Sequence, residues 1–280
     1  MRKQFITTVT DLFEKDDKCV LLLGDIGVFG FSSLAKDYPD RVINMGICEQ
    51  ATIGVASGMA KEGLHPIFYT IAPFAVERCL EQIKIDIGYQ NLPVTIVSVG
   101  ASYDYAGLGC THHCPSDISL LKTIPNISIF APSYKEDVDS LLKGRHGKEA
   151  IYMRLPNNAC DIMNYVLDID RDILVLAFGE TVDNVKSACE GLEVDILPSF
   201  IASKQNPPVY LARKKVIIIE PWYVGTMHYD IQLQYKDSKV FSIGVPRQFL
   251  TNYGTKQQHD HKYGLDIEGL RKQITDIINE

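Results

Sequence analysis

The stretch 45-MGICEQATIGVASGMAKEG-63 decides the fold of the first half of the chain, because it has the composition of a helix built for burial. Ala, Gly, Ile and Val dominate the run, and one carboxylate, Glu49, stands near its start. A carboxylate in the first turn of a helix complements the positive end of the helix dipole, which is a structural explanation. The chemical alternative is that a carboxyl held there shares a proton with a group bound against it. The stretch alone leaves both interpretations open.

Short runs rich in β-branched residues flank this helix and alternate with further helical stretches. The strands expected in the first half are 19–24, 41–46, 65–71, 93–100, 127–132 and 150–155, with helices at 49–61, 73–89 and 134–142. Nearly continuous apolar strands separated by helices are typical of a parallel sheet covered on both faces. The first half is therefore predicted to form an α/β domain.

The same pattern restarts after residues 156–170, which show no clear period and are interpreted as a linker. Further strands are expected at 172–178, 193–200, 215–221 and 239–246, and a closing helix at 266–279. A chain of 280 residues is about twice as long as a typical domain. We therefore predict an α/β fold of two successive three-layer domains with mostly parallel sheets, covering residues 1–160 and 161–280.

Composition excludes several classes of partner. The formal net charge is −7, from 28 Lys and Arg against 35 Asp and Glu, and the chain has no long basic run. These properties argue against binding to nucleic acid or to a membrane surface. No apolar stretch approaches the roughly 20 residues that cross a bilayer, and seven scattered cysteines without a secretory signal are typical of a reducing compartment. We expect a cytoplasmic protein.

Ligands of parallel α/β sheets bind beyond the carboxyl ends of the strands, where the polar and glycine-rich residues of the first half also gather. One of these loops, 106-AGLGCTHHCPSD-117, places two cysteines and two histidines within five residues. Adjacent histidine side chains point in divergent directions, and no second ligand pair follows at the spacing of a structural zinc site. We predict no metal ligands in this chain. The loop either presents a histidine to a pocket or packs it in the core.

Two arginines allow two interpretations each. Arg154 ends the expected strand in AIYMRLPNN, and Arg78 lies on the helix that follows 70-TIAPF-74. Either side chain is a solvated surface cation or a fork that binds a phosphate. The residues themselves do not decide between these roles.

The segment 40-DRVINMGICEQATIGVASGMAKEGLHPIFYTIAPFAVERCLEQI-83, with 91-NLPVTIVSVG-100 and the Thr-His-His motif at 111–113, resembles the pyrimidine-binding domain of the transketolase family. That family includes the 1-deoxyxylulose-5-phosphate synthases. The second half, with IIIEPWYVGTMHYDI and 244-GVPRQFLTNYGTKQQHDHKYGLDIEGLRKQI-274, resembles the C-terminal domain of the family. The resemblance implies thiamine diphosphate as cofactor. It also implies transfer of a two-carbon ketol unit from a ketose or its phosphate to an aldose.

The resemblance also assigns roles to residues. Glu49 matches the glutamate that hydrogen-bonds N1′ of the aminopyrimidine and promotes its imino tautomer, so that the 4′-nitrogen removes the C2 proton of the thiazolium. Phe74 matches the aromatic residue that stacks on that ring, and His112 matches the histidine that exchanges protons with substrate hydroxyls. Arg154 and Arg78 match arginines that hold the phosphate end of the substrate.

Two departures from the family shape the prediction. Leu108 stands three positions before Thr111, where the family usually has an Asp that contacts a substrate hydroxyl. No Gly-Asp-Gly with a downstream Asn, the family's diphosphate and metal site, matches here. We therefore predict one subunit of a split transketolase. Its partner chain would supply the diphosphate-binding half with Mg²⁺ or Ca²⁺, most plausibly in an α2β2 heterotetramer.

Two alternatives stay open. One is a subunit of a deoxyxylulose-phosphate-synthase-like or 2-oxo acid dehydrogenase-like enzyme, although the Thr-His-His motif and GVPRQF favour the transketolase side. The other is a non-catalytic binding or regulatory module with the same fold, for which Leu108 is the best support. A scaffold does not need Glu49, Phe74, His112 and Arg154 together, which argues against that module. The sequence leaves the donor sugar, the acceptor sugar and the pathway undetermined.

Overall fold

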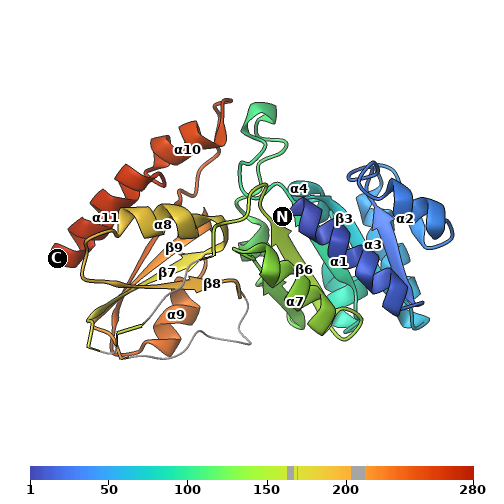
Figure 1. Ribbon diagram of the computed structural model, residues 1–280, viewed down its shortest axis with the longest axis horizontal. Helices are drawn as coiled ribbons and strands as arrows, with labels where there is room; N and C mark the ends of the chain where they lie inside the picture. The colour runs from blue at the N-terminus through green and yellow to red at the C-terminus, as the bar shows by residue number, and fades with distance from the viewer. Residues whose placement is uncertain (163–166, 169, 203–211) are drawn as a thin grey trace.

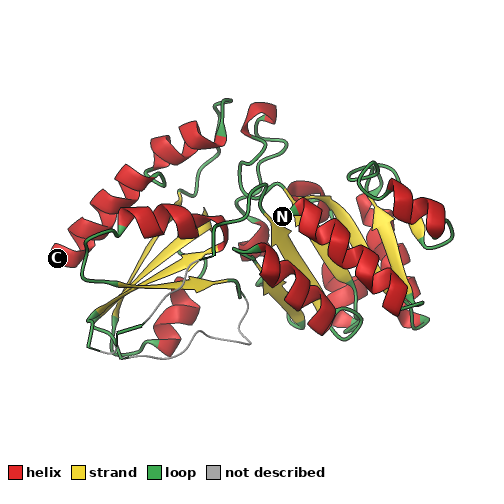
Figure 2. Ribbon diagram, viewed as in Figure 1, coloured by secondary structure: helices red, strands yellow, loops and turns green. Residues whose placement is uncertain are grey.

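Two parallel sheets form the frame of the computed structural model, which describes residues 1–162, 167–168, 170–202 and 212–280 (Figures 1 and 2). The first sheet has six strands in the order β2-β1-β3-β4-β6-β5, and the second has four in the order β10-β9-β7-β8. Each pairing between neighbouring strands is parallel. The predicted α/β class with two mostly parallel sheets is confirmed.

The first sheet and its helices occupy the first 155 residues. The strands are β1 (Cys19–Leu23), β2 (Val42–Asn44), β3 (His65–Ile71), β4 (Thr95–Val99), β5 (Ile127–Phe130) and β6 (Ala150–Leu155). The helices are α1 (Arg2–Lys15), α2 (Ser32–Asp37), α3 (Glu49–Lys61), α4 (Ala72–Ala75), α5 (Leu80–Gln82), a π-helical stretch (Ile83–Tyr89), a 3₁₀ turn (Ala106–Leu108), α6 (Asp117–Leu121) and α7 (Lys135–Arg145).

The second sheet follows the segment that the sequence marks as a linker. Its strands are β7 (Ile173–Phe178), β8 (Asp195–Ser199), β9 (Lys215–Tyr223) and β10 (Lys239–Val245). Its helices are a 3₁₀ turn (Gly179–Thr181), α8 (Val182–Ala188), α9 (His228–Gln234), α10 (Lys256–Tyr263) and α11 (Ile267–Asn279). The domain boundary at residue 160 stays a prediction. It falls between the end of β6 and the start of β7.

Alternating side chains along the buried strands explain why helices cover both faces of the first sheet. Leu21 and Leu23 of β1 join the cluster under α1, which also contains Phe5 and Val9. Leu22, the residue between them, faces the cluster on the other side of the sheet, together with residues of α3. Successive strand side chains point to opposite faces, so a strand of only apolar residues needs cover on both.

The predicted helix 73–89 is interrupted in the structure. It begins as the short α4, leaves helical geometry after Ala75, and resumes as α5 and the π-helical stretch. Pro73 stands in the first turn of α4, a position where proline is tolerated because its missing N–H has no helical partner. The interruption turns the segment directly after β3, which is where the predicted site residues Phe74 and Arg78 lie.

The two sheets meet along the β5 side of the first. The backbone N–H of Ala131 donates to the carbonyl of Phe200 at 2.8 Å, and Phe130 forms an antiparallel bridge with Ile201. Apolar residues of both sheets belong to one buried cluster, for example Ile96 in β4 and Leu176 in β7. None of the helices in the described part of the chain combines the length and apolar character that a bilayer span requires.

Candidate active site

The loops after β2, β3 and β4 end at one edge of the first sheet and carry the predicted site residues there. Glu49 opens α3 after β2, Phe74 and Arg78 follow β3, and His112 lies in the loop after β4. In a parallel sheet these carboxyl ends share one edge, so segments far apart in the sequence meet there. The structure brings Glu49, Phe74, Arg78 and His112 together.

Glu49 is buried although it carries a carboxylate. Its exposed fraction is 2%, and it lies in the first turn of α3, where the helix dipole favours a negative charge. Nη1 of Arg78 donates to Oε2 of Glu49 at 2.7 Å. Among the described residues, this arginine is the side-chain partner found for Glu49. The Arg78 side chain is 40% exposed. The buried carboxylate is therefore paired with an arginine that also contacts solvent.

Phe74 lies between the ion pair and the histidine. The guanidinium carbon of Arg78 stands 4.2 Å from the centroid of the Phe74 ring, within the range of a cation–π contact. The other neighbour of Phe74 is His112, whose ring centroid is 5.3 Å away at an interplanar angle of 69°. Glu49, Arg78, Phe74 and His112 therefore form a continuous row of contacts at the sheet edge.

Two further residues orient His112, of which the sequence singled out Thr111 only as part of the Thr-His-His motif. Oγ1 of Thr111 lies 3.0 Å from Nδ1 of His112, and the ring of Tyr105 lies edge-on at a centroid distance of 6.2 Å. Arg2 of α1 in turn hydrogen-bonds the hydroxyl of Tyr105. The Thr111 contact was readable in principle, because it involves sequence neighbours, whereas the Tyr105 contact depends on how the loop folds.

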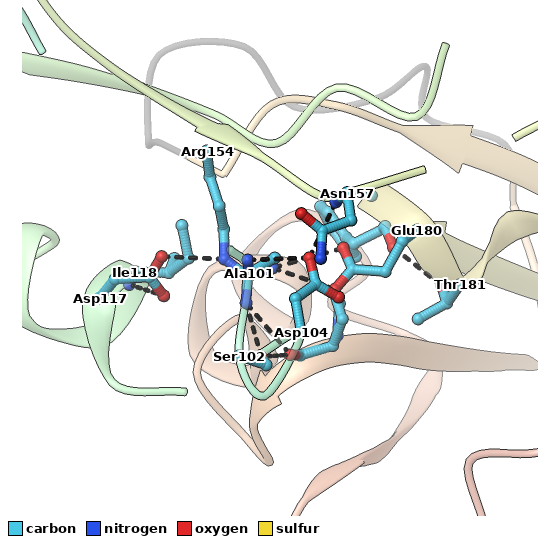
Figure 3. A network of polar contacts seen from close by, with 12 residues as sticks. Ala101, Ser102, Asp104, Asp117, Ile118, Arg154, Asn157, Glu180 and Thr181 are labelled. Carbon is cyan, nitrogen blue, oxygen red and sulfur yellow. Dashed lines mark hydrogen bonds and ion pairs between the residues drawn. The ribbon is translucent and has the colours of Figure 1, made fainter. Parts of the chain in front are cut away.

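Arg154 lies elsewhere and differs from its prediction as a phosphate ligand. The residue is inside β6 and 1% exposed, with Asp117 on one side and Glu180 on the other (Figure 3). Its Nε donates to Oδ2 of Asp117 at 2.8 Å, and Nη1 reaches the two carboxylate oxygens of Glu180 at 3.4 and 3.3 Å. Nη2 donates to Oγ of Ser102 and to the carbonyl of Pro221.

These contacts give Arg154 a structural role. A guanidinium has five N–H donors, and the acceptors above account for all of them, so none is left for a phosphate. Burial lowers the pKa of Arg154, but attraction to Asp117 and Glu180 outweighs that effect and holds the pKa above its usual value. Since Glu180 follows β7, this ion pair also ties the second sheet to the first.

A known family matches this arrangement of residues. The family model for the transketolase pyrimidine-binding domain covers residues 1–160, more than half of the chain. The chain belongs to the transketolase family. The predicted family and its transketolase-type enzyme class are thereby confirmed, and membership implies dependence on thiamine diphosphate.

Relatives of this transketolase-family chain include proteins of similar length. An uncharacterized 33.6 kDa protein in the fasciation locus of Rhodococcoides fascians is 34% identical over 98% of this chain and 93% of its own. One of the subunits of the apulose-4-phosphate transketolase of Phocaeicola vulgatus is 27% identical over 100% of this chain and 97% of its own. The 1-deoxy-D-xylulose-5-phosphate synthase of Aquifex aeolicus is 25% identical over 98% of this chain but 48% of its own.

A solved structure has the same fold over nearly its whole length. A split-gene transketolase described as an inactive β4 tetramer aligns with a TM-score of 0.82, covering 98% of this chain and 97% of the other at 22% identity. At that identity the likeness shows the fold. The arrangement of both sheets in this transketolase-family chain is therefore that of a known structure.

Proposed function

We propose that this chain is one subunit of a split, thiamine-diphosphate-dependent transketolase that transfers a two-carbon ketol unit from a ketose phosphate to an aldose. The observation that carries the proposal is the buried carboxylate of Glu49, which lies at a helix start and is linked through Arg78 to an aromatic ring and a histidine. The pyrimidine-domain match supports it, as does a relative of similar length that is named as a subunit of a transketolase.

The residues present fit a planar, nitrogen-containing ring. A carboxylate that is 2% exposed needs a hydrogen-bonding partner, and its partner here is a flexible arginine rather than a fixed backbone group. The half-buried ring of Phe74 packs against that arginine and offers a surface for stacking. When bound, thiamine diphosphate supplies the nucleophilic carbon that breaks and re-forms the carbon–carbon bond of the sugar.

Glu49 is placed to share the proton that matters for this chemistry. In the structure Oε2 accepts a charge-assisted hydrogen bond from Arg78. A heterocyclic nitrogen bound at that oxygen would share a proton with it, and burial keeps water from competing for the same oxygen. Glu49 thus acts as the group that sets the protonation of the ring nitrogen.

Arg78 and His112 serve the substrate end of the site. Only one of the five N–H groups of Arg78 is engaged by Glu49, so its half-exposed guanidinium has donors left for a phosphate. His112 is half-buried, and Thr111 together with the edge of Phe74 fixes its orientation. We assign it the exchange of protons with sugar hydroxyls. We do not assign Arg154 to phosphate binding, because its guanidinium is buried in ion pairs with Asp117 and Glu180.

Exposed apolar side chains around the site support the proposal of a partner chain. Exposed apolar side chains stand in the loops at the same edge, with exposed fractions of 96% for Phe29, 76% for Ile47 and 54% for Leu108. Gly54 and Gly58 lie on the exposed side of α3, where an added Cβ would meet no atom closer than 4.0 Å. We infer that these exposed apolar side chains and the open glycine face of α3 contact another protein. A second chain docked here would close the site.

That second chain would carry the diphosphate-binding half and its Mg²⁺ or Ca²⁺, in an α2β2 assembly. The described residues contain no match to the family's Gly-Asp-Gly site, and a split-gene structural neighbour is described as an inactive tetramer of one kind of subunit. The seven cysteines are free thiols, which suits the cytoplasm as its location.

Reconstitution tests whether this chain needs a partner chain for activity. The purified chain is assayed with thiamine diphosphate, Mg²⁺, a ketose phosphate and an aldose, first alone and then with a candidate partner that carries Gly-Asp-Gly and a downstream Asn. We expect no turnover by the chain alone and turnover that saturates at equal amounts of the two chains. Robust turnover by the chain alone would refute the split.

A further inference from the structure

Three residues meet at the edge of the first sheet that is opposite to Glu49. Asp16 follows α1 and precedes β1, His65 opens β3, and His146 follows α7. One ligand atom from each, a carboxylate oxygen or an imidazole nitrogen, lies within 4.8 Å of the others. These residues stand before their strands, whereas the candidate active site lies beyond the carboxyl ends, so the two groups are separate.

The three side chains are held in place by their neighbours. Nδ1 of His65 is 2.6 Å from Oδ2 of Asp16, and the backbone N–H of Lys18 donates to Oδ1 of the same carboxylate at 3.0 Å. Nδ1 of His146 lies 3.1 Å from Oγ1 of Thr95, a contact that fixes the orientation of the imidazole. The Lys18 and Thr95 contacts engage the non-ligating atoms of Asp16 and His146, an arrangement that is typical of metal sites.

Gly147 shows how closely the chain approaches this group. Its φ is +70°, and a Cβ added there would lie 2.7 Å from the ring of His65. Only glycine therefore fits both the backbone conformation and the space. The imidazoles of His65 and His146 pack edge to face, with ring centroids 5.7 Å apart.

A simpler interpretation is an Asp–His ion pair beside a histidine of the core. It explains the 2.6 Å contact between His65 and Asp16, but it does not explain the missing hydrogen-bond partner of Nε2 of His146 in the described part of the chain. That nitrogen is buried, on a side chain 8% exposed, and it has no hydrogen-bond partner among the described residues. A buried polar atom without a partner costs about 1–3 kcal/mol. A bound cation would give the nitrogens of this cluster their partner.

We propose that Asp16, His65 and His146 form a binding site for a divalent transition metal, with Zn²⁺ as the best-suited ion. Two imidazoles and one carboxylate are a known three-ligand set for zinc, with a fourth position for water. Zinc–ligand distances of about 2.1 Å place neighbouring ligands about 3.4 Å apart. The 2.6 Å pair would therefore widen by less than about 1 Å, and the wider separations would close by about 1.4 Å at most.

Two of the three proposed ligands reach the protein surface. Asp16 and His65 are 23% and 26% exposed, which leaves a path for the ion and room for a water ligand. The site would clamp the end of α1, the start of β3 and the end of α7, so its role would be structural.

Zinc binding by the chain itself tests the proposal. The tag-free chain is stripped with a chelator, the exposed thiols Cys48 and Cys110 are alkylated, and Zn²⁺ alone is added. Metal content, calorimetric titration and thermal unfolding are then measured. We expect one zinc per chain, a higher Tm with zinc, and at least tenfold weaker binding in His146→Gln and Asp16→Asn.

His261→Gln is the matched control. His261 and Asp266 form a similar pair, with 2.7 Å between Nδ1 and Oδ2, but His261 is 78% exposed and the pair has no third ligand among the described residues. This variant should bind zinc like the unmodified chain. If His146→Gln fails to fold by circular dichroism, His65→Gln and Asp16→Asn provide the comparison. Equal zinc affinity in the unmodified chain and the folded ligand variants would overturn the proposal, as would binding weaker than about millimolar in the unmodified chain.

Discussion

Arg78 contacts Glu49 and Phe74 at once: its Nη1 is 2.7 Å from Oε2 of Glu49, and its guanidinium carbon is 4.2 Å from the Phe74 ring centroid. The arginine therefore contacts both of the residues that the resemblance assigns to binding of the aminopyrimidine ring. A ring bound against Glu49 would take the hydrogen bond that Arg78 now makes. The guanidinium would then turn toward the substrate, on the solvent-exposed side of the site.

Replacing Arg78 with Ala should weaken binding of a phosphorylated ketose specifically. A charge-assisted hydrogen bond contributes about 1.5–3 kcal/mol, so KM for the ketose phosphate should rise about 10- to 100-fold. KM for the unphosphorylated ketose should change little, and Arg78→Lys should recover part of the loss. Steady-state kinetics of the reconstituted complex provide the measurement. An equal rise for both substrates would mean that Arg78 acts through Glu49 and not through a phosphate.

Replacing Phe74 with Leu should weaken binding of the cofactor. The stacking surface beside Glu49 is lost while an apolar side chain of similar size remains, and aromatic pairs contribute about 0.5–1.5 kcal/mol beyond buried area. The Kd of the reconstituted complex for thiamine diphosphate should rise up to about tenfold, and Phe74→Tyr should restore it. Tyr229→Leu, at a 70% exposed position on α9, is the control. Unchanged affinity in Phe74→Leu would remove this residue from the site.

Arg154 should matter for stability and not for phosphate binding. Arg154→Met leaves Asp117 and Glu180 buried without their cation, a loss that costs about 3–5 kcal/mol. Urea unfolding should show this lower free energy of unfolding. Arg247→Met, at an exposed position, should leave the free energy of unfolding nearly unchanged. Any folded fraction of Arg154→Met should keep its KM for the ketose phosphate. A raised KM with unchanged stability would restore the role that the resemblance assigned.

Glu180 should make the stability depend on pH. Burial raises the pKa of Glu180, opposed by the positive charge of Arg154 and reinforced by the neighbouring carboxyl of Asp104. An acid with a raised pKa in the folded state stabilises the fold at low pH and loses that contribution as the pH rises through the folded-state pKa. The stability of Glu180→Gln relative to the unmodified chain should therefore increase from about pH 4 to about pH 8.

Urea unfolding across that range measures the Glu180 effect. Glu136→Gln, whose side chain is 51% exposed, should show no such trend. A relative stability of Glu180→Gln that falls with rising pH would mean that the ion pair with Arg154 outweighs burial.

The sequence predicted the fold, and it predicted that four of the proposed site residues lie at one sheet edge, because both are encoded locally. Apolar strands alternate with helices along the chain, and Glu49, Phe74, Arg78 and His112 each follow a strand whose carboxyl end reaches the same sheet edge. Parallel topology alone is enough to bring such residues together. Position at a strand end was therefore enough to predict that these four residues lie close together.

Arg154 shows where that guide fails. It also stands near a strand end, but its environment is decided by Asp117, 37 residues earlier, and by Glu180, which follows β7 of the second sheet. Neither contact has a local signal in the sequence. The same holds for Asp16, His65 and His146, because Asp16 and His65 are 49 residues apart and come together only when the sheet forms. Non-local ion pairs and ligand sets therefore had to be read from the structure.

Replacement of Glu49 with Gln in the reconstituted complex tests the central claim most directly. Gln keeps the size of the side chain but cannot exchange the proton, so kcat for ketol transfer should fall by about 10²- to 10⁴-fold, while the two chains still assemble. Glu81→Gln, at an exposed position on α5, should keep full activity. Turnover by Glu49→Gln equal to that of the unmodified complex would contradict the account.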